Sequence, residues 1–278
     1  MQAEVLVDGV ETDAGWLQER GFQFGDGLFE TVAIRQGKPC LWQAHLTRLA
    51  QGCRRLRLPL PDFSRLADEA SLLCAGLERA VLKIYWTAGR SERGYRRPAA
   101  LQPQRIVCRS DWPTQPVVWH LRQCTHRLGE NPGLAEIKHL NRLEQVLARA
   151  EWDDPSVAEG LMLGQDGRVV SGTMSNVFVQ RGSELHTPAV AAAGIAGVVR
   201  KLVLDAGERV ATVVQVGRVS LRDVHEADAL YLANSLMGLV RVDRYENIDY
   251  RASVDTHQAV VEARRLCHQP EAWDAQHE

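Results

Sequence analysis

Two segments of this 278-residue chain carry side chains that could do covalent or phosphate chemistry. Lys138 lies where a strand or loop gives way to a predicted helix, with the cationic Arg142 nearby. Loss of water and a neighbouring positive charge both lower the pKa of a lysine, which would make Lys138 a nucleophile and proton carrier. The plain alternative is a solvated surface lysine, and the residue types alone leave both interpretations open.

The second segment is the glycine-rich run at residues 194–200, which leads into a predicted helix. Free backbone N–H groups and the dipole at a helix start favour a phosphate. The run matches neither the Walker A spacing nor the dinucleotide-binding glycine pattern. A tight loop whose small residues allow close packing is the simpler alternative.

Arginines supply the remaining candidates. Arg48 lies off the apolar stripe of its predicted helix, and Gly52 one turn later would allow something to approach closely. Arg93 and Tyr95 lie in a polar loop rich in arginine, whose guanidinium groups can bind carboxylates through two hydrogen bonds. Solvated surface arginines remain the alternative at both places.

Composition excludes several function classes. The formal net charge is -2, so bulk charge does not favour nucleic acid or an anionic membrane as a partner. The histidines and cysteines show no metal-ligand spacing, so no metal site is expected. The longest apolar stretch, residues 189–199, is about half of the ~20 residues that span a bilayer. Residues 1–4 lack a signal-peptide pattern, and we expect a cytoplasmic protein.

The elements that must position these residues mix strands and helices without strict alternation, which favours an α+β fold. In the first half we predict a hairpin at Asp8-Gly9, strands at 28–35, 81–87 and 105–109, and helices from Trp42 to Pro59 and at 63–77. Prolines and polar residues at 111–116 suggest a linker, and we divide the chain into domains 1–111 and 112–278.

In the second half, the lysine segment precedes a predicted helix at 140–150 with Leu140, Leu143, Leu147 and Ala150 on one face. The further predictions are strands at 117–124, 177–180, 229–233 and 240–243, a hairpin at 161–171, a helix ending near Gly207 and a last helix at 253–267.

Taken in order, several segments resemble the fold-type IV pyridoxal-phosphate enzymes, which include the class IV aminotransferases. The resemblance lies in residues 24–31 (FGDGLFET), 45–49 (HLTRL), 171–178 (SGTMSNVF), 194–200 (GIAGVVR) and 234–236 (NSL). Residues 137–142 (IKHLNR) are similar to the lysine motif of aminodeoxychorismate lyases within that family. The match covers roughly residues 4–245, and the lysine segment is its most specific part.

The resemblance implies a fold and a set of roles. It implies a small N-terminal α/β domain, a larger C-terminal pseudo-barrel domain, and pyridoxal 5'-phosphate as the cofactor. Lys138 would bind the cofactor covalently and act as the catalytic base. Arg93 and Tyr95 fall where relatives place contacts to substrate carboxylates. The remaining cofactor contacts would come from Arg48, Ser171, Asn176, Gly197, Val198, Val199, Ser235 and Leu236.

Ser171 departs from the family pattern. Relatives commonly carry a glutamate there, which pairs with the pyridine nitrogen and strengthens the cofactor as an electron sink. A serine offers only a neutral hydrogen bond. Our hypothesis is that a lyase tolerates serine because formation of an aromatic product drives its elimination.

The activity implied by the resemblance is cleavage of 4-amino-4-deoxychorismate to p-aminobenzoate and pyruvate for folate synthesis, by a homodimer. Two alternatives remain at this point. One is an aminotransferase of the same fold acting on D- or branched-chain amino acids, against which the residues after Lys138 argue. The other is a non-catalytic pyridoxal-phosphate-binding protein, which Ser171 alone invites.

Overall fold

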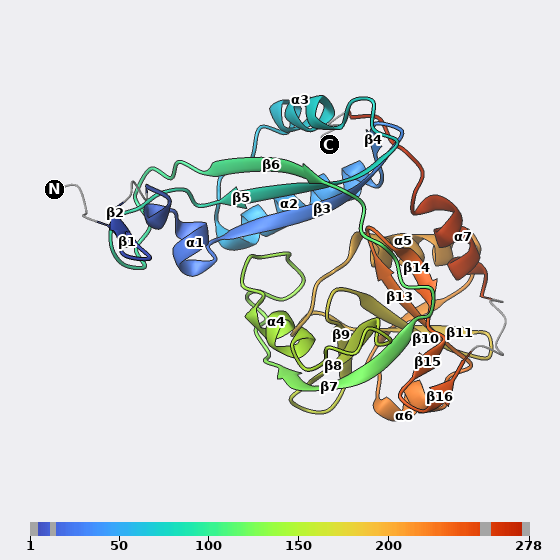
Figure 1. Cartoon of the computed structure of the whole chain (residues 1–278). Coiled ribbons are helices and arrows are strands. Elements are labelled where there is room, and N and C mark those ends of the chain that lie inside the picture. The colour runs from blue at the N-terminus through green and yellow to red at the C-terminus, as the bar shows by residue number, and fades with distance from the viewer. Residues whose placement is uncertain (1–4, 12–14, 251–256, 274–278) are drawn as a thin grey trace.

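The computed structural model describes residues 5–11, 15–250 and 257–273 (Figure 1). Strands form one four-stranded sheet, two five-stranded sheets and a small hairpin, and the helices pack around them. The prediction of an α+β fold with antiparallel and mixed sheets is therefore confirmed.

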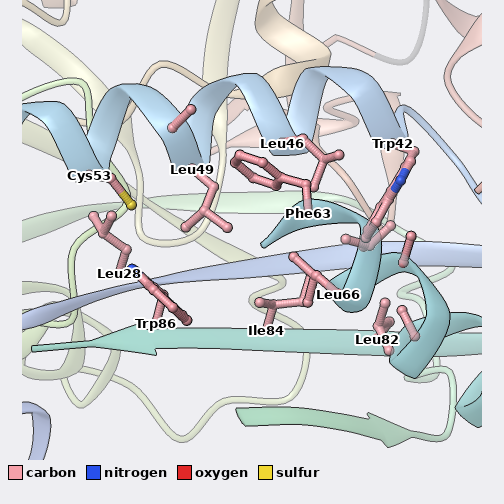
Figure 2. Packing of buried hydrophobic residues seen from close by; sticks show 14 of the residues in the cluster. Leu28, Trp42, Leu46, Leu49, Cys53, Phe63, Leu66, Leu82, Ile84 and Trp86 are labelled. Atoms are coloured by element: carbon pink, nitrogen blue, oxygen red, sulfur yellow. The ribbon is translucent and has the colours of Figure 1, made fainter. Parts of the chain in front are cut away.

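The first sheet has the strand order β4-β3-β5-β6 and is antiparallel throughout. Two helices, α2 and α3, cover one of its faces (Figure 2). Alternation along β3 places Leu28, Val32 and Ile34 on that face, where they meet the apolar stripe of α2. The bounds are β3 Gly27–Arg35, β4 Lys38–Pro39, α2 Trp42–Leu56, α3 Phe63–Cys74, β5 Arg79–Thr87 and β6 Gln104–Ser110.

Local signals predicted this half of the chain well. The hairpin at Asp8-Gly9 joins β1 (Leu6–Val7) to β2 (Val10–Glu11). Asp62 caps α3, because its Oδ1 accepts a hydrogen bond from the Arg65 backbone N–H at 3.0 Å. The short helices η1 (Gly15–Gln18) and α1 (Arg20–Phe24), which precede β3, were not predicted.

The two five-stranded sheets, ordered β16-β15-β7-β8-β9 and β12-β11-β10-β13-β14, share an apolar core. Leu121, Leu161, Val179 and Leu232 lie in that core without exposed surface. Parallel pairs join β7 to β8 and β11 to β12. The bounds are β7 His120–Leu128, β8 Glu159–Gly164, β9 Val169–Gly172, β10 Asn176–Arg181, β11 Glu184–Pro188, β12 Val214–Gly217, β13 Ala229–Asn234, β14 Gly238–Arg241, β15 Arg244–Tyr245 and β16 Ile248–Asp249.

Helices cover the outer face of the second of these sheets. Helix α5 (Val198–Arg209) packs beside α7 (Gln258–Leu266) in a cluster with Phe178 and Tyr231. The short α6 (Leu221–His225) begins with a capping box between Ser220 and Asp223. The predicted last helix began at residue 253, but residues 253–256 lie outside the described part of the chain.

The prediction for the helix after Lys138 was partly wrong. Helix α4 spans Leu143–Arg149 and begins three residues late, because residues 138–140 are extended and hydrogen-bond to the start of β3. Its predicted apolar face does not enter the core: Leu143 is 68% exposed and Leu147 is 49% exposed. The periodicity of the sequence identified an apolar face on this helix, but it could not show whether that face packs into the core or stays exposed.

The division into two domains at residue 111 stays a prediction. Residues that follow α7 contact the part of the chain that lies before this boundary. After α7, Pro270 forms a bridge with Cys40, and the Trp273 ring lies 5.2 Å from the Trp42 ring. Figure 1 shows this segment returning toward α3 and β4. Among the described helices, none combines the length and apolarity needed to cross a bilayer. The cytoplasmic location stays a prediction.

Candidate active site

Lys138 lies on a short extended segment that joins the edge of the first sheet. The Phe29 N–H donates to the Lys138 carbonyl at 2.9 Å, and the Leu140 N–H donates to the Gly27 carbonyl at 3.0 Å. This pairing brings Lys138 to the same side as Phe29, with Nζ 4.2 Å from the centre of the Phe29 ring. The sequence motifs at residues 24–31 and 137–142 therefore meet in space.

The Lys138 amine is tuned for chemistry at neutral pH. Its pKa falls to about 7, because burial of the amine disfavours its charged form and because the Arg48 charge adds to this effect. The Glu30 carboxylate opposes the shift. An amine with this pKa is available as both nucleophile and base near pH 7. The alternative of a fully solvated surface lysine is wrong.

We expect the reactivity of Lys138 toward a small aromatic aldehyde to follow this pKa. The neutral amine is the reactive form, so the rate should rise about tenfold per pH unit below 7 and level off above it. Borohydride trapping followed by peptide mass spectrometry measures the modified fraction at each pH. A rate that keeps rising toward pH 10 would show an ordinary lysine, and the exposed Lys201 supplies that reference profile within the same samples.

A buried charge cluster holds Arg48. Glu30 accepts from Arg48 Nε at 2.8 Å and from Nη2 at 2.6 Å, and His45 Nδ1 lies 2.6 Å from the same carboxylate. Burial disfavours ionisation of Glu30, but the Arg48 charge and the hydrogen bonds from Arg48 and His45 outweigh it, so its pKa falls to about 2. Arg48 is thus fixed in place by a permanent carboxylate.

Glu30 and His45 were not predicted as functional residues. Glu30 lies on the face of β3 that carries Leu28 and Val32, and its side chain is 1% exposed. A carboxylate between apolar neighbours of a buried strand face needs a cationic partner, and that pattern could have identified it. Gly52, which we expected to open space near Arg48, instead makes room for Leu28: a Cβ there would lie 2.8 Å from its methyl groups.

The start of α5, to which the glycine-rich run leads, meets Arg48. Arg48 Nη1 donates to the Ala196 carbonyl at 3.2 Å, directly before the helix. Gly197 is the N-cap residue and carries no side chain that could satisfy the N–H groups of Val198 and Val199. A Cβ at Gly197 would lie 2.0 Å from Asn176 Oδ1, so this position has no room for a larger residue. Asn176 in turn donates to the Ile195 carbonyl at 2.9 Å.

Ser235 and Leu236 lie in the turn between β13 and β14, against β3. The Ser235 hydroxyl donates to the Thr31 carbonyl at 2.6 Å, one residue from Glu30. The Leu236 N–H donates to Asn234 Oδ1 at 2.9 Å. The predicted site residues from α2, α5 and this turn therefore gather around Glu30 and Thr31 in the middle of β3, and the Ser235 hydroxyl and the Leu236 N–H already have acceptors within the chain.

Ser171 lies on β9, opposite Met162 of β8, and is 7% exposed. The loop that follows it is held by Glu159, which sequence analysis did not single out. Glu159 accepts from the N–H groups of Thr173 and Met174 at 3.0 and 3.2 Å, and from the Ser175 hydroxyl at 2.9 Å. The role of Glu159 is to fix the backbone between Ser171 and Asn176.

Arg93 and Tyr95 lie on the exposed loop between β5 and β6, and Tyr95 lines a pocket of about 280 Å³ together with His139 and Asn141. The Tyr95 side chain is 85% exposed. The buried Arg20 anchors the loop by donating to the Ser91 hydroxyl and to the Tyr95 carbonyl, both at 2.9 Å. Arg93 and Tyr95 therefore lie on a loop that Arg20 anchors, and within one chain both side chains are open to solvent.

This arrangement can combine two functions. Two of the five guanidinium N–H groups of Arg48 have no acceptor within the described chain, and the first N–H groups of α5 lie beside them. Together they suit a phosphate group. The Lys138 amine, whose pKa is influenced by the Arg48 charge, can attack a carbonyl carbon on the same small molecule. The residues present therefore fit a cofactor that carries both a phosphate and an aldehyde.

Comparison with known proteins gives the family. Residues 27–245 match the family described as amino-transferase class IV. The aminodeoxychorismate lyase of Vibrio harveyi is 35% identical over 241 residues, which are 85% of this chain and 89% of that protein.

Solved structures agree with this match. The crystal structure of 4-amino-4-deoxychorismate lyase from Pseudomonas aeruginosa has a TM-score of 0.82 and 40% identity, covering 90% of this chain and 92% of that one. The PLP-bound form of a hypothetical aminotransferase from Mycobacterium tuberculosis shares the fold at 19% identity, with a TM-score of 0.77 and coverage of 94% and 96%. The expected fold-type IV architecture is confirmed, and the chain belongs to the class IV aminotransferase family.

Proposed function

We propose that this protein is an aminodeoxychorismate lyase, which converts 4-amino-4-deoxychorismate to p-aminobenzoate and pyruvate. The observation that supports it most is the Lys138 amine with a pKa of about 7, next to the buried Glu30–Arg48 pair. The relatives at 35% and 40% identity carry this activity in their names, whereas the aminotransferase compared above is 19% identical.

Pyridoxal 5'-phosphate is the proposed cofactor, and it supplies an aldehyde for attachment and a ring that withdraws electrons. In this assignment Arg48 and the N–H groups of Val198 and Val199 bind its phosphate, and the Ser235–Leu236 turn completes the walls of this phosphate-binding cup. Gly197 and Asn176 shape that cup. Ser171 would offer the pyridine nitrogen of the cofactor a neutral hydrogen bond. A carboxylate at this position would make the cofactor ring a stronger electron sink.

Lys138 carries the proton steps in this proposal. Released from its covalent attachment, its neutral amine removes the proton from the substrate carbon that bears nitrogen. A pKa near 7 lets the same amine return a proton later, because both forms are populated at neutral pH. Arg93 and Tyr95 are proposed to bind the substrate carboxylates, since a dianionic substrate requires cationic and hydrogen-bonding groups.

Ser171→Glu should shift the balance of reactions. A carboxylate at residue 171 would strengthen the electron sink that transamination needs, so the ratio of transamination to lyase rate should rise by roughly tenfold, about 1.4 kcal/mol. Both rates are measured on the same purified protein with D-alanine and with 4-amino-4-deoxychorismate. Ser171→Gln, which matches glutamate in size without its charge, is the control, and an equal shift in both variants would refute the electronic explanation.

A homodimer is proposed as the assembly. Helix α4 exposes Leu143, Val146 and Leu147 on one face, and the loop carrying Arg93 and Tyr95 is open to solvent. Exposed apolar side chains grouped on a helix support contact with a second copy. Light scattering coupled to size-exclusion chromatography measures the mass directly, and a monomer at micromolar concentration would contradict the assembly.

The decisive test follows both products from purified protein supplied with pyridoxal phosphate and 4-amino-4-deoxychorismate. Equal amounts of p-aminobenzoate and pyruvate are expected. Amino acids with 2-oxoglutarate form the parallel assay for transamination. Transamination without lyase products would identify an aminotransferase, and cofactor binding without either activity would identify a non-catalytic binding protein.

A further inference from the structure

One buried carboxylate holds the turn that joins β9 to β10. The turn is closed by the Gly172 N–H, which donates to the Ser175 carbonyl at 2.8 Å. Glu159 is the first residue of β8, and its side chain, which is 1% exposed, points at this turn through several hydrogen bonds. The turn therefore depends on a charged group from a neighbouring strand.

The described partners of the Glu159 carboxylate are N–H and O–H donors, and none of them is a cation. Its Oε1 accepts from the Gly160 N–H at 2.9 Å, from the Thr173 N–H at 3.0 Å and from the Thr173 hydroxyl at 2.5 Å. Its Oε2 accepts from the Met174 N–H at 3.2 Å and from the Ser175 hydroxyl at 2.9 Å. A buried carboxylate is costly unless donors surround it, and here three consecutive residues of the turn supply them.

The residue after the turn reaches the start of α5. Asn176 Nδ2 donates to the Ile195 carbonyl at 2.9 Å, and a Cβ at Gly197 would lie 2.0 Å from Asn176 Oδ1. Asn176 thus sets how closely the N-cap residue of α5 approaches β10. Because the N–H groups of Val198 and Val199 follow Gly197 directly, the location of these two donors depends on the turn.

A second contact joins the same turn to the one between β13 and β14. The Met174 carbonyl accepts from Asn234 Nδ2 at 3.3 Å. Asn234 Oδ1 in turn accepts from the N–H groups of Leu236 and Met237, both at 2.9 Å. One side chain therefore closes the β13–β14 turn and ties it to the backbone that Glu159 holds.

We infer that Glu159 is a positioning residue for the phosphate-binding cup. The turn that it holds fixes two walls of this cup relative to each other, namely the start of α5 through Asn176 and the Ser235–Leu236 turn through Asn234. Charge-assisted hydrogen bonds suit this role, because they are stronger than those between neutral groups. The inference rests on the proposed function, since it needs the phosphate of the proposed cofactor in this cup.

Glu159→Gln tests the role with two aldehydes, pyridoxal 5'-phosphate and pyridoxal, which lacks the phosphate. Glutamine keeps the size of the side chain, but its NH₂ group only donates, so either the Thr173 N–H or the Met174 N–H loses its acceptor. Dissociation constants are measured by absorbance titration of the purified protein. Both aldehydes would attach to Lys138 in the same way, so the ratio of the two constants isolates the contribution of the phosphate.

The preference for the phosphorylated aldehyde should fall about tenfold or more in Glu159→Gln, because the cup is no longer preorganised. A purely structural role would weaken binding of both aldehydes alike and leave the ratio unchanged. Ser175→Ala removes one donor to the carboxylate and keeps both bonds from backbone N–H groups in the turn. It should lower the preference by a smaller factor, roughly threefold.

Glu151→Gln is the matched control. Glu151 accepts from the N–H groups of Thr125 and His126 at 2.8 and 2.7 Å, so it holds the backbone of β7 with the same kind of bonds. This variant should keep the wild-type preference, whatever its melting temperature.

An undiminished preference in Glu159→Gln, or in Ser175→Ala if Glu159→Gln does not fold, overturns the inference and leaves the proposed function intact. Wild-type protein that binds both aldehydes equally would overturn the cofactor assignment, and this inference with it. Since the readout is binding, it does not depend on which reaction the protein catalyses.

Discussion

Lys138→Ala is expected to lower kcat/KM for p-aminobenzoate formation by roughly 10⁴-fold or more, because one amine serves as both attachment point and base. The environment of the amine supports this magnitude. Its pKa of about 7 results from burial and from the Arg48 charge, and no other described lysine has a resolved shift. Product formation is followed under saturating cofactor.

Two control variants separate chemistry from folding. Lys138→Arg keeps a positive charge and a long side chain but cannot lose its proton at neutral pH, so it should be as inactive as Lys138→Ala. Lys201→Ala removes an exposed lysine that pairs with Asp205, and it should keep wild-type activity. A Lys138→Ala protein within tenfold of wild type would rule out Lys138 as the catalytic residue.

Glu30→Gln is expected to lower the free energy of unfolding by about 3–5 kcal/mol, the usual cost of removing one partner from a buried ion pair. Without the carboxylate, the Arg48 charge is left in a site where the arginine is 9% exposed, and His45 loses its partner at 2.6 Å. Urea denaturation of the cofactor-free protein measures the loss. Glu69→Gln, which breaks the more exposed pair with Arg105, should cost less than about 1 kcal/mol.

The pH dependence gives this prediction a second readout. The Glu30 pKa is lowered from 4.5 to about 2 in the folded protein, so its contribution is fully present above pH 4.5 and is lost as pH falls toward 2. The stability difference between wild type and Glu30→Gln should therefore shrink over that range. A constant difference would show that the variant acts through packing. Weaker cofactor binding should accompany the loss, because Glu30 holds Arg48 in place.

Local patterns along the chain determined much of this protein. The run of β-branched and apolar residues over 28–35, the Asp8-Gly9 turn and the Asp62 cap each depend on neighbours within a few residues, and the corresponding elements formed as predicted. The order of the motifs around Arg48 and Lys138 indicated the family and the fold, both of which comparison confirmed.

Tertiary structure decided what those residues do to one another. The exposed apolar face of α4 and the extended course of residues 138–140 follow from pairing with β3, more than one hundred residues earlier in the chain. The Lys138 pKa depends on water exclusion and on a charge from another helix, and neither is encoded by its neighbours in sequence. Glu30 and Glu159 act through partners that only the folded chain brings within hydrogen-bonding distance. Desolvation and electrostatic interactions are properties of spatial neighbours, so the tuning of this site had to come from the fold.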